Sequence, residues 1–204
     1  MSRIDNYKER LNRAFPKAIK NDVETVCSIL PLDNHNIELK DGKAFNMATL
    51  IHEQEFTVIL QDETLVIPYR LYFDEPVQNL VETLNKIQKT ILHCIYLRHH
   101  NGFVRGRHLR ELIDHNEAWI IPHILPLLGE YVYELIEILD EHISKSNISF
   151  YYSFIQENPK YWNTIKGRVT SYWNEYYRDK SPQFKHYLGK KIIRKIEKNA
   201  ELRE

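Results

Sequence analysis

The sequence predicts an α+β protein, in which a small N-terminal antiparallel sheet with flanking helices is followed by a larger all-helical array of stacked helices. Between residues 35 and 73, apolar and polar residues alternate, which is typical of half-buried strands. From Pro76 onward, the apolar residues recur at helical spacing instead. No linker separates the two patterns, so we expect residues 1–75 and residues 76–204 to pack as one compact unit.

The first 30 residues predict two helices separated by a proline. Residues 4–15 place their apolar side chains on one face, with charged residues between them. Pro16 is expected to end that helix, because a proline disfavours helical geometry in the residue before it. A second helix is expected over about residues 21–30, with Pro31 after it.

The alternating region predicts a sheet of three or four strands. Asp41-Gly42 between two short runs indicates a hairpin, because glycine accepts the positive φ of a type I′ turn. Residues 56–61 and 65–73 also alternate, and a short turn between them would pair them as two more strands. Pro68 cannot donate a hydrogen bond to a neighbouring strand, so we expect its strand at an edge or bulged at that point.

The rest of the chain predicts a series of helices. An apolar stripe after Pro76 indicates one long helix that ends at Asn101-Gly102. The helix after it is expected to bury Phe103, and Pro126 is expected to kink a later helix or break it into two short pieces. The expected helices after the first are at about residues 103–114, 117–128, 130–144, 148–157, 160–178 and 183–200.

The composition argues against several classes of protein. The net charge of the 204 residues is zero, so no overall field favours nucleic acid or a membrane. The first residues are charged, and no run approaches the roughly 20 apolar residues of a membrane span. Cys27 and Cys94 lack the spacing of a zinc site, and we expect both to be reduced and buried. We therefore expect a cytoplasmic protein with no membrane partner.

The charge is unevenly distributed along the chain. Residues 149–204 carry 12 Lys and Arg against 6 Asp and Glu, whereas residues 1–75 carry 9 against 13. The basic C-terminal segment can therefore pair with the acidic N-terminal part or with an acidic partner.

Residues 102–143 contain a weak internal repeat. GFVRGRHLRELI is followed by an apolar helix with Pro122 and then by GEYVYELIEIL, and each outer segment opens a helix with an aromatic-valine pair. This section resembles HEAT-like helical repeats, in which a Val-Arg pair such as Val104-Arg105 recurs near a helix start. Its 28-residue spacing is shorter than the roughly 40 residues of such repeats. The resemblance implies a stacked scaffold that binds along one face, and it implies no reaction.

A polar segment at one predicted helix start is the first candidate site. Its candidate binding residues are Arg98, His99, His100, Arg105, Arg107 and His108. Cations beside the free N–H groups of a helix N-terminus are what an anion or phosphate requires. The alternative is structural: Arg105 pairs with a carboxylate such as Glu130 between helices, and the histidines make capping hydrogen bonds.

The aromatic and basic C-terminal segment is the second candidate site. Its candidate binding residues are Tyr172, Trp173, Lys190, Lys191 and Arg194. Single-stranded nucleic acid is bound by such mixtures, because bases stack on the rings and cations follow the phosphates. Tyr172 and Tyr176 lie in one helical row, which fits a buried face or a protein interface equally well.

The sequence carries no catalytic motif. No HExxH pair, P-loop, GxGxxG or GxSxG occurs, and we predict no metal and no cofactor. We therefore expect a non-catalytic protein–protein interaction module, such as an adaptor, an inhibitor or an immunity-type partner. Two alternatives stay open: a nucleic-acid-binding protein that uses both candidate sites, and an enzyme acting on a phosphorylated or anionic small molecule.

Overall fold

The computed structural model describes residues 2–38, 44–144 and 146–198, and it confirms the α+β class. By its internal contacts the chain divides into two compact units. Unit 1 comprises Met1–Thr57 and Glu63–Arg105, and unit 2 comprises Val58–Asp62 and Gly106–Glu204. The predicted boundary between residues 75 and 76 stays a prediction. Within the described residues, no helix is long and apolar enough to cross a membrane.

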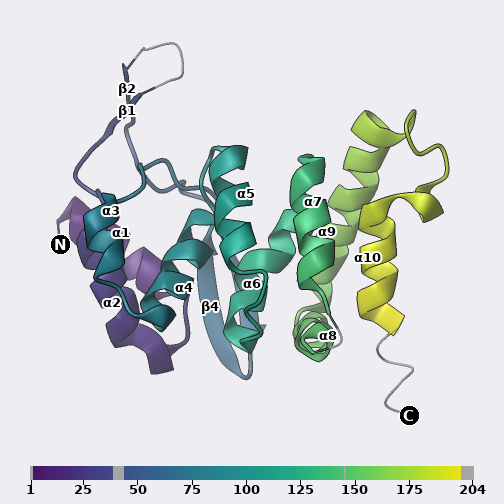
Figure 1. The fold of residues 1–204 in the computed structure, drawn as a ribbon, viewed down its shortest axis with the longest axis horizontal. Helices are drawn as coiled ribbons and strands as arrows, with labels where there is room; N and C mark the ends of the chain where they lie inside the picture. Colours follow the sequence, from purple (N-terminus) through teal and green to yellow (C-terminus); the bar gives the residue numbers. More distant parts are fainter. Residues whose placement is uncertain (1, 39–43, 145, 199–204) are drawn as a thin grey trace. The chain divides into compact units, whose positions relative to one another are not determined.

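Unit 1 packs helices against short strands (Figure 1). Ser2 and Asp5 form a capping box at the start of the first helix, which fixes where the chain becomes helical. Pro16 separates the first two helices, as predicted. The helical segments up to residue 96 are α1 (Arg3–Asn12), a 3-10 turn (Lys17–Ile19), α2 (Lys20–Ile29), α3 (Gln78–Glu82) and α4 (Lys86–Tyr96).

The strands form two separate two-stranded sheets, so the single sheet of three or four strands was a wrong prediction for the described residues. β1 (Asn36–Glu38) pairs antiparallel with β2 (Ala44–Asn46), and the predicted Asp41-Gly42 turn lies outside the described residues. β3 (Glu55–Leu60) pairs with β4 (Glu63–Pro68). The two residues between these strands both have positive φ, at 51° and 67°, as a tight hairpin turn requires.

The single long helix predicted after Pro76 is two helices, α3 and α4. A capping box interrupts the stripe: the side chain of Asn85 accepts from the N–H of Gln88 at 2.9 Å, and the side chain of Gln88 accepts from the N–H of Asn85 at 3.0 Å. Gln88 also donates to Asp22 of α2 at 2.9 Å, which holds the start of α4 against α2. The apolar spacing alone did not reveal this break. An N-cap side chain acts only on the backbone of the first helical turn and leaves the spacing of the apolar residues on either side unchanged.

We predict that Asn85→Ala lowers the free energy of unfolding by about 1 kcal/mol, the usual effect of removing an N-cap side chain. Asn85→Ser keeps a capping oxygen and is expected to stay near the wild-type value. Urea denaturation followed by circular dichroism measures both. Equal stability of the alanine and serine variants would contradict the capping role.

Phe103 is a second correction. It lies in the first turn of α5 (Gly102–Glu111) and was expected to be buried, but its side chain is 74% exposed. The side chain of Asn101 accepts from the N–H of Phe103 at 2.9 Å and thereby sets the start of the helix. That start turns Phe103 away from the core while Val104 is buried.

Unit 2 is helical apart from the end of β3. Pro126 breaks the apolar stretch before it into short pieces, as predicted. Helix α8 matches its predicted range and α7 lies within its own, whereas α9 gives way to a π-helix after Tyr172 and α10 begins at Leu188, five residues later than predicted. The helical segments after α5 are a 3-10 turn (Ala118–Ile120), α6 (Ile121–Ile124), a 3-10 helix (Leu125–Gly129), α7 (Tyr133–His142), α8 (Ile148–Glu157), α9 (Pro159–Tyr172), a π-helix (Trp173–Tyr177), a 3-10 turn (Phe184–His186) and α10 (Leu188–Glu197).

Asn158, between α8 and α9, holds the end of β3 within unit 2 by hydrogen bonds. Its side-chain oxygen accepts from the N–H of Ile59 at 2.7 Å, and its side-chain nitrogen donates to the carbonyl oxygens of Ile59 at 2.7 Å and Phe154 at 2.9 Å. The strand end thus finds its backbone partners on a side chain rather than on another strand.

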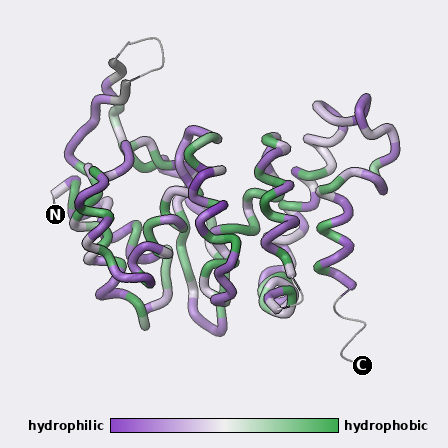
Figure 2. Tube along the Cα trace, in the orientation of Figure 1, coloured by the Kyte–Doolittle hydropathy of each residue, from purple (hydrophilic) through white to green (hydrophobic). Residues whose placement is uncertain are grey.

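Helix α10 is strongly amphipathic. Figure 2 shows hydrophobic and hydrophilic residues alternating along it. Ile192, Ile193 and Ile196 are buried, whereas Lys191 and Arg194 are exposed. Helix α10 packs against both α7 and α9, and this packing positions the aromatic residues described below.

Candidate functional site

Three polar side chains of the segment from Arg98 to Arg105 are buried in unit 1. Arg98, His99 and Arg105 are 3%, 5% and 2% exposed. The Arg105 guanidinium donates to the carbonyl oxygens of His99 at 2.6 Å and His100 at 2.9 Å. The guanidinium therefore satisfies the carbonyls of the turn that precedes α5, and a buried charge with such partners holds that turn in one conformation.

The histidines of this segment differ in environment. Burial lowers the pKa of His99 to about 4, with the neighbouring His100 and Arg105 acting in the same direction. The ring of His99 accepts a hydrogen bond from the N–H of Asn101 at 3.2 Å. His100 is exposed and stacks on the ring of Tyr72, with 5.7 Å between the ring centroids.

Unit 2 holds the rest of the segment, where Arg107 is exposed and His108 is buried. The hydrogen bonds from the Arg105 guanidinium to the backbone show how this charge is satisfied, and the sequence did not predict these two acceptors. Anion binding by this segment stays a prediction. Among the described residues, no group of three or more His, Cys, Asp or Glu side chains is arranged to hold a metal ion.

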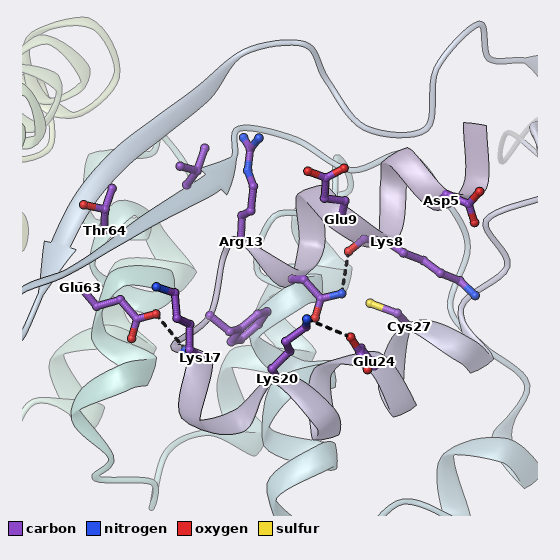
Figure 3. A pocket seen from close by; sticks show the side chains of 13 residues that line it. Asp5, Lys8, Glu9, Arg13, Lys17, Lys20, Glu24, Cys27, Glu63 and Thr64 are labelled. Atoms are coloured by element: carbon purple, nitrogen blue, oxygen red, sulfur yellow. Dashed lines mark hydrogen bonds and ion pairs between the residues drawn. The ribbon is translucent and has the colours of Figure 1, made fainter. Parts of the chain in front are cut away.

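Unit 1 also contains a hollow of about 830 Å³ between α1, α2 and β4 (Figure 3). Its charged lining is balanced, with four cationic and four anionic side chains. Figure 3 shows Lys20 directed to Glu24, at 3.6 Å, and Glu63 accepting from the N–H of Lys17, at 2.9 Å. Burial raises the pKa of the Cys27 thiol to about 12, so it is a poor nucleophile at neutral pH. The hollow therefore favours neither sign of ligand charge and offers no activated group.

Aromatic residues from separate parts of the sequence gather in unit 2. Tyr133 is the first residue of α7 and Tyr131 lies two residues before it, whereas the others come from the end of α9, the π-helix and the residue before α10. In a π-helix each backbone hydrogen bond spans five residues instead of the four of an α-helix, and such segments are often found at functional sites. The members of this tyrosine cluster are Tyr131, Tyr133, Tyr172, Tyr176, Tyr177 and Tyr187.

Three members form an exposed tyrosine patch, which we define as Tyr131, Tyr172 and Tyr176. Their ring centroids lie 5.9 to 6.1 Å apart, and Tyr131 and Tyr176 are each 54% exposed. The hydroxyl of Tyr177 donates to the backbone oxygen of Tyr131 and so fixes the start of α7 against the π-helix. The patch is therefore a group of large rings in mutual contact and in contact with solvent.

No family model, no curated protein and no solved structure matches this chain. What the patch can bind is therefore inferred from the chemistry of its own residues. Tyrosine combines a large apolar face with a hydroxyl and loses little conformational entropy on binding, which makes it a frequent anchor of protein interfaces.

The structure brings some of the predicted C-terminal residues together and separates others. Tyr172 belongs to the patch, but Trp173 is occupied: its indole N–H donates to the backbone oxygen of Ser181 at 2.8 Å, and it packs on Phe184 with ring centroids 4.9 Å apart. Lys190 lies over the ring of Phe184, at 5.6 Å from its centroid. Lys191 and Arg194 are exposed on α10.

Sequence reasoning missed Tyr131 and Tyr133 as members of a site. They lie about 40 residues before Tyr172, and only the packing of the 3-10 helix (Leu125–Gly129) on α9 brings the two segments together. A Cβ on Gly129 would lie 3.3 Å from the Cβ of Arg168, which shows how closely the backbones approach there. The one sequence signal was the unusual density of tyrosine in GEYVYEL.

Proposed function

We propose that the protein is a non-catalytic interaction module that binds an acidic partner protein through the exposed tyrosine patch. The observation that supports this most directly is the mutual contact of Tyr131, Tyr172 and Tyr176 at a solvent-exposed surface. Clusters of exposed aromatic rings are uncommon on surfaces without a partner, and tyrosine is enriched among the residues that contribute most to binding.

The charge of the surrounding chain supports an acidic partner. Residues 149–204, which supply two of the three tyrosines, carry twice as many basic as acidic residues. Such complementarity accelerates encounter and suppresses unsuitable partners more than it adds affinity. The resemblance of residues 102–143 to HEAT-like repeats agrees with a binding scaffold and stays a prediction.

Nucleic acid is a less favoured partner. Base stacking needs aromatic faces that are free, and Trp173 packs on Phe184 while Tyr177 stacks on Tyr187. The exposed cations Lys191 and Arg194 lie on α10, and the tyrosine patch does not include them.

The double variant Tyr131→Ala/Tyr176→Ala is expected to weaken partner binding by roughly 30-fold or more, which corresponds to two interface anchors. Both substitutions leave the backbone oxygen of Tyr131 in place as the acceptor for Tyr177. The partner is identified by affinity capture from the native cell, and its binding is then measured by calorimetry with both proteins purified. Phe103→Ala, which removes a still more exposed ring from unit 1, is the matched control and is expected to bind normally.

Equal affinity of the wild-type protein and the double variant for the purified partner would overturn the proposal. So would a captured partner that proves to be RNA or DNA and that dissociates when Lys191 and Arg194 are neutralised, because that result identifies the nucleic-acid alternative.

A further inference from the structure

Two rows of like charge lie on neighbouring helices of unit 2, one on α7 and one on α10. Both rows have the spacing i, i+3, i+7, which places their side chains on one side of a helix. All of these side chains are exposed, and none of them makes an ion pair or a hydrogen bond within the described residues. The acidic row is Glu134, Glu137 and Glu141, and the basic row is Lys191, Arg194 and Lys198, the last of which directly follows α10.

The two helices run in the same direction and at the same level. Near their starts the rings of Tyr133 and Tyr187 are 6.2 Å apart, and near their ends Lys195 contacts Asp140 at 3.0 Å. Each helix has ten residues. The acidic row of α7 therefore lies beside the basic row of α10, and the two rows extend over nearly the same length.

Both rows point away from the interior of unit 2. The buried side of α10 consists of Gly189 and the isoleucines of the helix, and helical spacing places the basic row on the opposite side. The buried side of α7 consists of leucines, isoleucines and His142, and the acidic row lies away from it in the same way. The ion pair of Asp140 with Lys195 joins the two helices and involves neither row. The two rows therefore belong to one face.

This face is complementary to itself. Each row contains like charges four positions apart, an arrangement that destabilises a helix unless opposite charges cover it. The acidic row carries the charge that would cover the basic row, and the basic row carries the charge that would cover the acidic row. The whole chain has a net charge of zero, so two copies do not repel each other at long range. A second copy of the chain therefore supplies both covering charges at once.

The charges also select one symmetry for such a pair. A two-fold axis parallel to the helices lays α7 of one copy on α10 of the other, so that an acidic row faces a basic row in two equivalent contacts. Because the helices are parallel and level, this rotation keeps the facing rows level as well. A two-fold axis across the helices would instead lay α7 on α7 and α10 on α10, and like charges would face each other.

We propose that this face binds a second copy of the chain, with the acidic row of each copy on the basic row of the other. Two helices of ten residues offer about 300 Å² on each copy, which is below the roughly 800 Å² of a standard interface. The dimer is therefore weak, and it dissociates as salt is added. This inference goes beyond partner binding at the tyrosine patch and does not depend on it.

Sedimentation velocity of the full chain over a range of concentrations tests the proposal. At low ionic strength the wild-type protein is expected to shift from monomer to dimer as its concentration rises, and about 0.5 M salt is expected to return it to monomer. Reversal of the acidic row by Glu137→Lys/Glu141→Lys, or of the basic row by Lys191→Glu/Arg194→Glu, is expected to weaken dimerisation by roughly tenfold or more. Each change acts twice in a symmetric dimer, so ion pairs that are individually weak give a measurable loss.

The decisive variant combines all four changes. It exchanges the signs of the two rows and leaves the net charge at zero. We expect it to dimerise with itself about as well as the wild-type protein does. We expect it not to dimerise with a dye-labelled wild-type chain, because like charges would then face each other in both contacts. Circular dichroism checks that the four surface substitutions leave the fold unchanged.

The control is Lys17→Glu/Lys160→Glu, which makes the same change in net charge as reversal of the basic row, at exposed lysines outside both rows. It is expected to retain most of the wild-type dimerisation. The proposal is overturned if the wild-type protein stays monomeric at low ionic strength, or if the control loses as much dimerisation as Lys191→Glu/Arg194→Glu. It is also overturned if the four-residue variant binds the wild-type chain as well as it binds itself. None of these measurements involves the partner proposed for the tyrosine patch.

Discussion

Replacing Arg105 with methionine is expected to lower the free energy of unfolding by about 3 kcal/mol. The guanidinium is 2% exposed and donates to the carbonyl oxygens of His99 and His100. Methionine retains much of the length and apolar volume of arginine, but it leaves two carbonyl groups without their donor. Each buried acceptor left unpaired costs about 1–3 kcal/mol, which sets the expected magnitude.

The comparison for Arg105→Met is Arg107→Met, which changes the same residue type two positions later at an exposed site. That change is expected to alter stability by no more than about 0.5 kcal/mol. Guanidinium chloride denaturation of both variants gives the two values. A loss for Arg105→Met no larger than that for Arg107→Met would show that the turn before α5 is held by other contacts.

Stability is expected to fall as the pH is lowered from about 6.5 toward 4, because of His99. Its pKa is depressed to about 4 in the folded protein, mainly by burial, and the ordinary value is 6.5. In this window the unfolded chain binds a proton that the folded protein does not, so the free energy of unfolding decreases as the pH falls. A difference of that size corresponds to about 3 kcal/mol over the whole window. Glu75 acts in the opposite direction, and the lowered pKa of His142 adds a loss of the same sign.

His99→Asn tests this pH dependence. Asparagine cannot titrate, and its side-chain oxygen can accept the N–H of Asn101 that the His99 ring accepts now. Denaturant unfolding at a series of pH values between about 4 and 7 is expected to show a shallower loss of stability for the variant. His52→Asn is the control for the substitution itself, because His52 accepts from the N–H of Gln54 in the same way at 3.0 Å. An unchanged slope for His99→Asn would remove His99 as the cause.

The candidate site shows which contacts the spacing of residues in the sequence predicts and which it does not. Spacing alone indicated that Tyr172 and Tyr176 share a helical face, and their rings do lie 6.0 Å apart. It gave no sign that Tyr131 would join them, because the contact depends on how the segment before α7 packs against the end of α9. The polar segment from Arg98 to His108 illustrates the reverse: its charges suggested an open site, and burial turned Arg105 toward the backbone.

Secondary structure followed the sequence where a local signal was strong. Pro16 and Pro126 mark real boundaries, since a proline acts on neighbouring backbone groups. The break between α3 and α4 was missed, because Asn85 caps through one side chain inside a continuous apolar stripe. The number of sheets was also mispredicted, since strand pairing beyond a hairpin joins residues distant in sequence.

The sequence by itself determined the α+β class, most of the helix positions and the tyrosine-rich, basic character of the last third, because periodicity, proline and composition act within a few residues. Only the tertiary structure decided which tyrosines share a surface and that the acidic row of α7 lies beside the basic row of α10. These features depend on burial and on contacts between distant segments. Burial and such contacts are fixed by how whole helices pack, and a local pattern does not encode that packing.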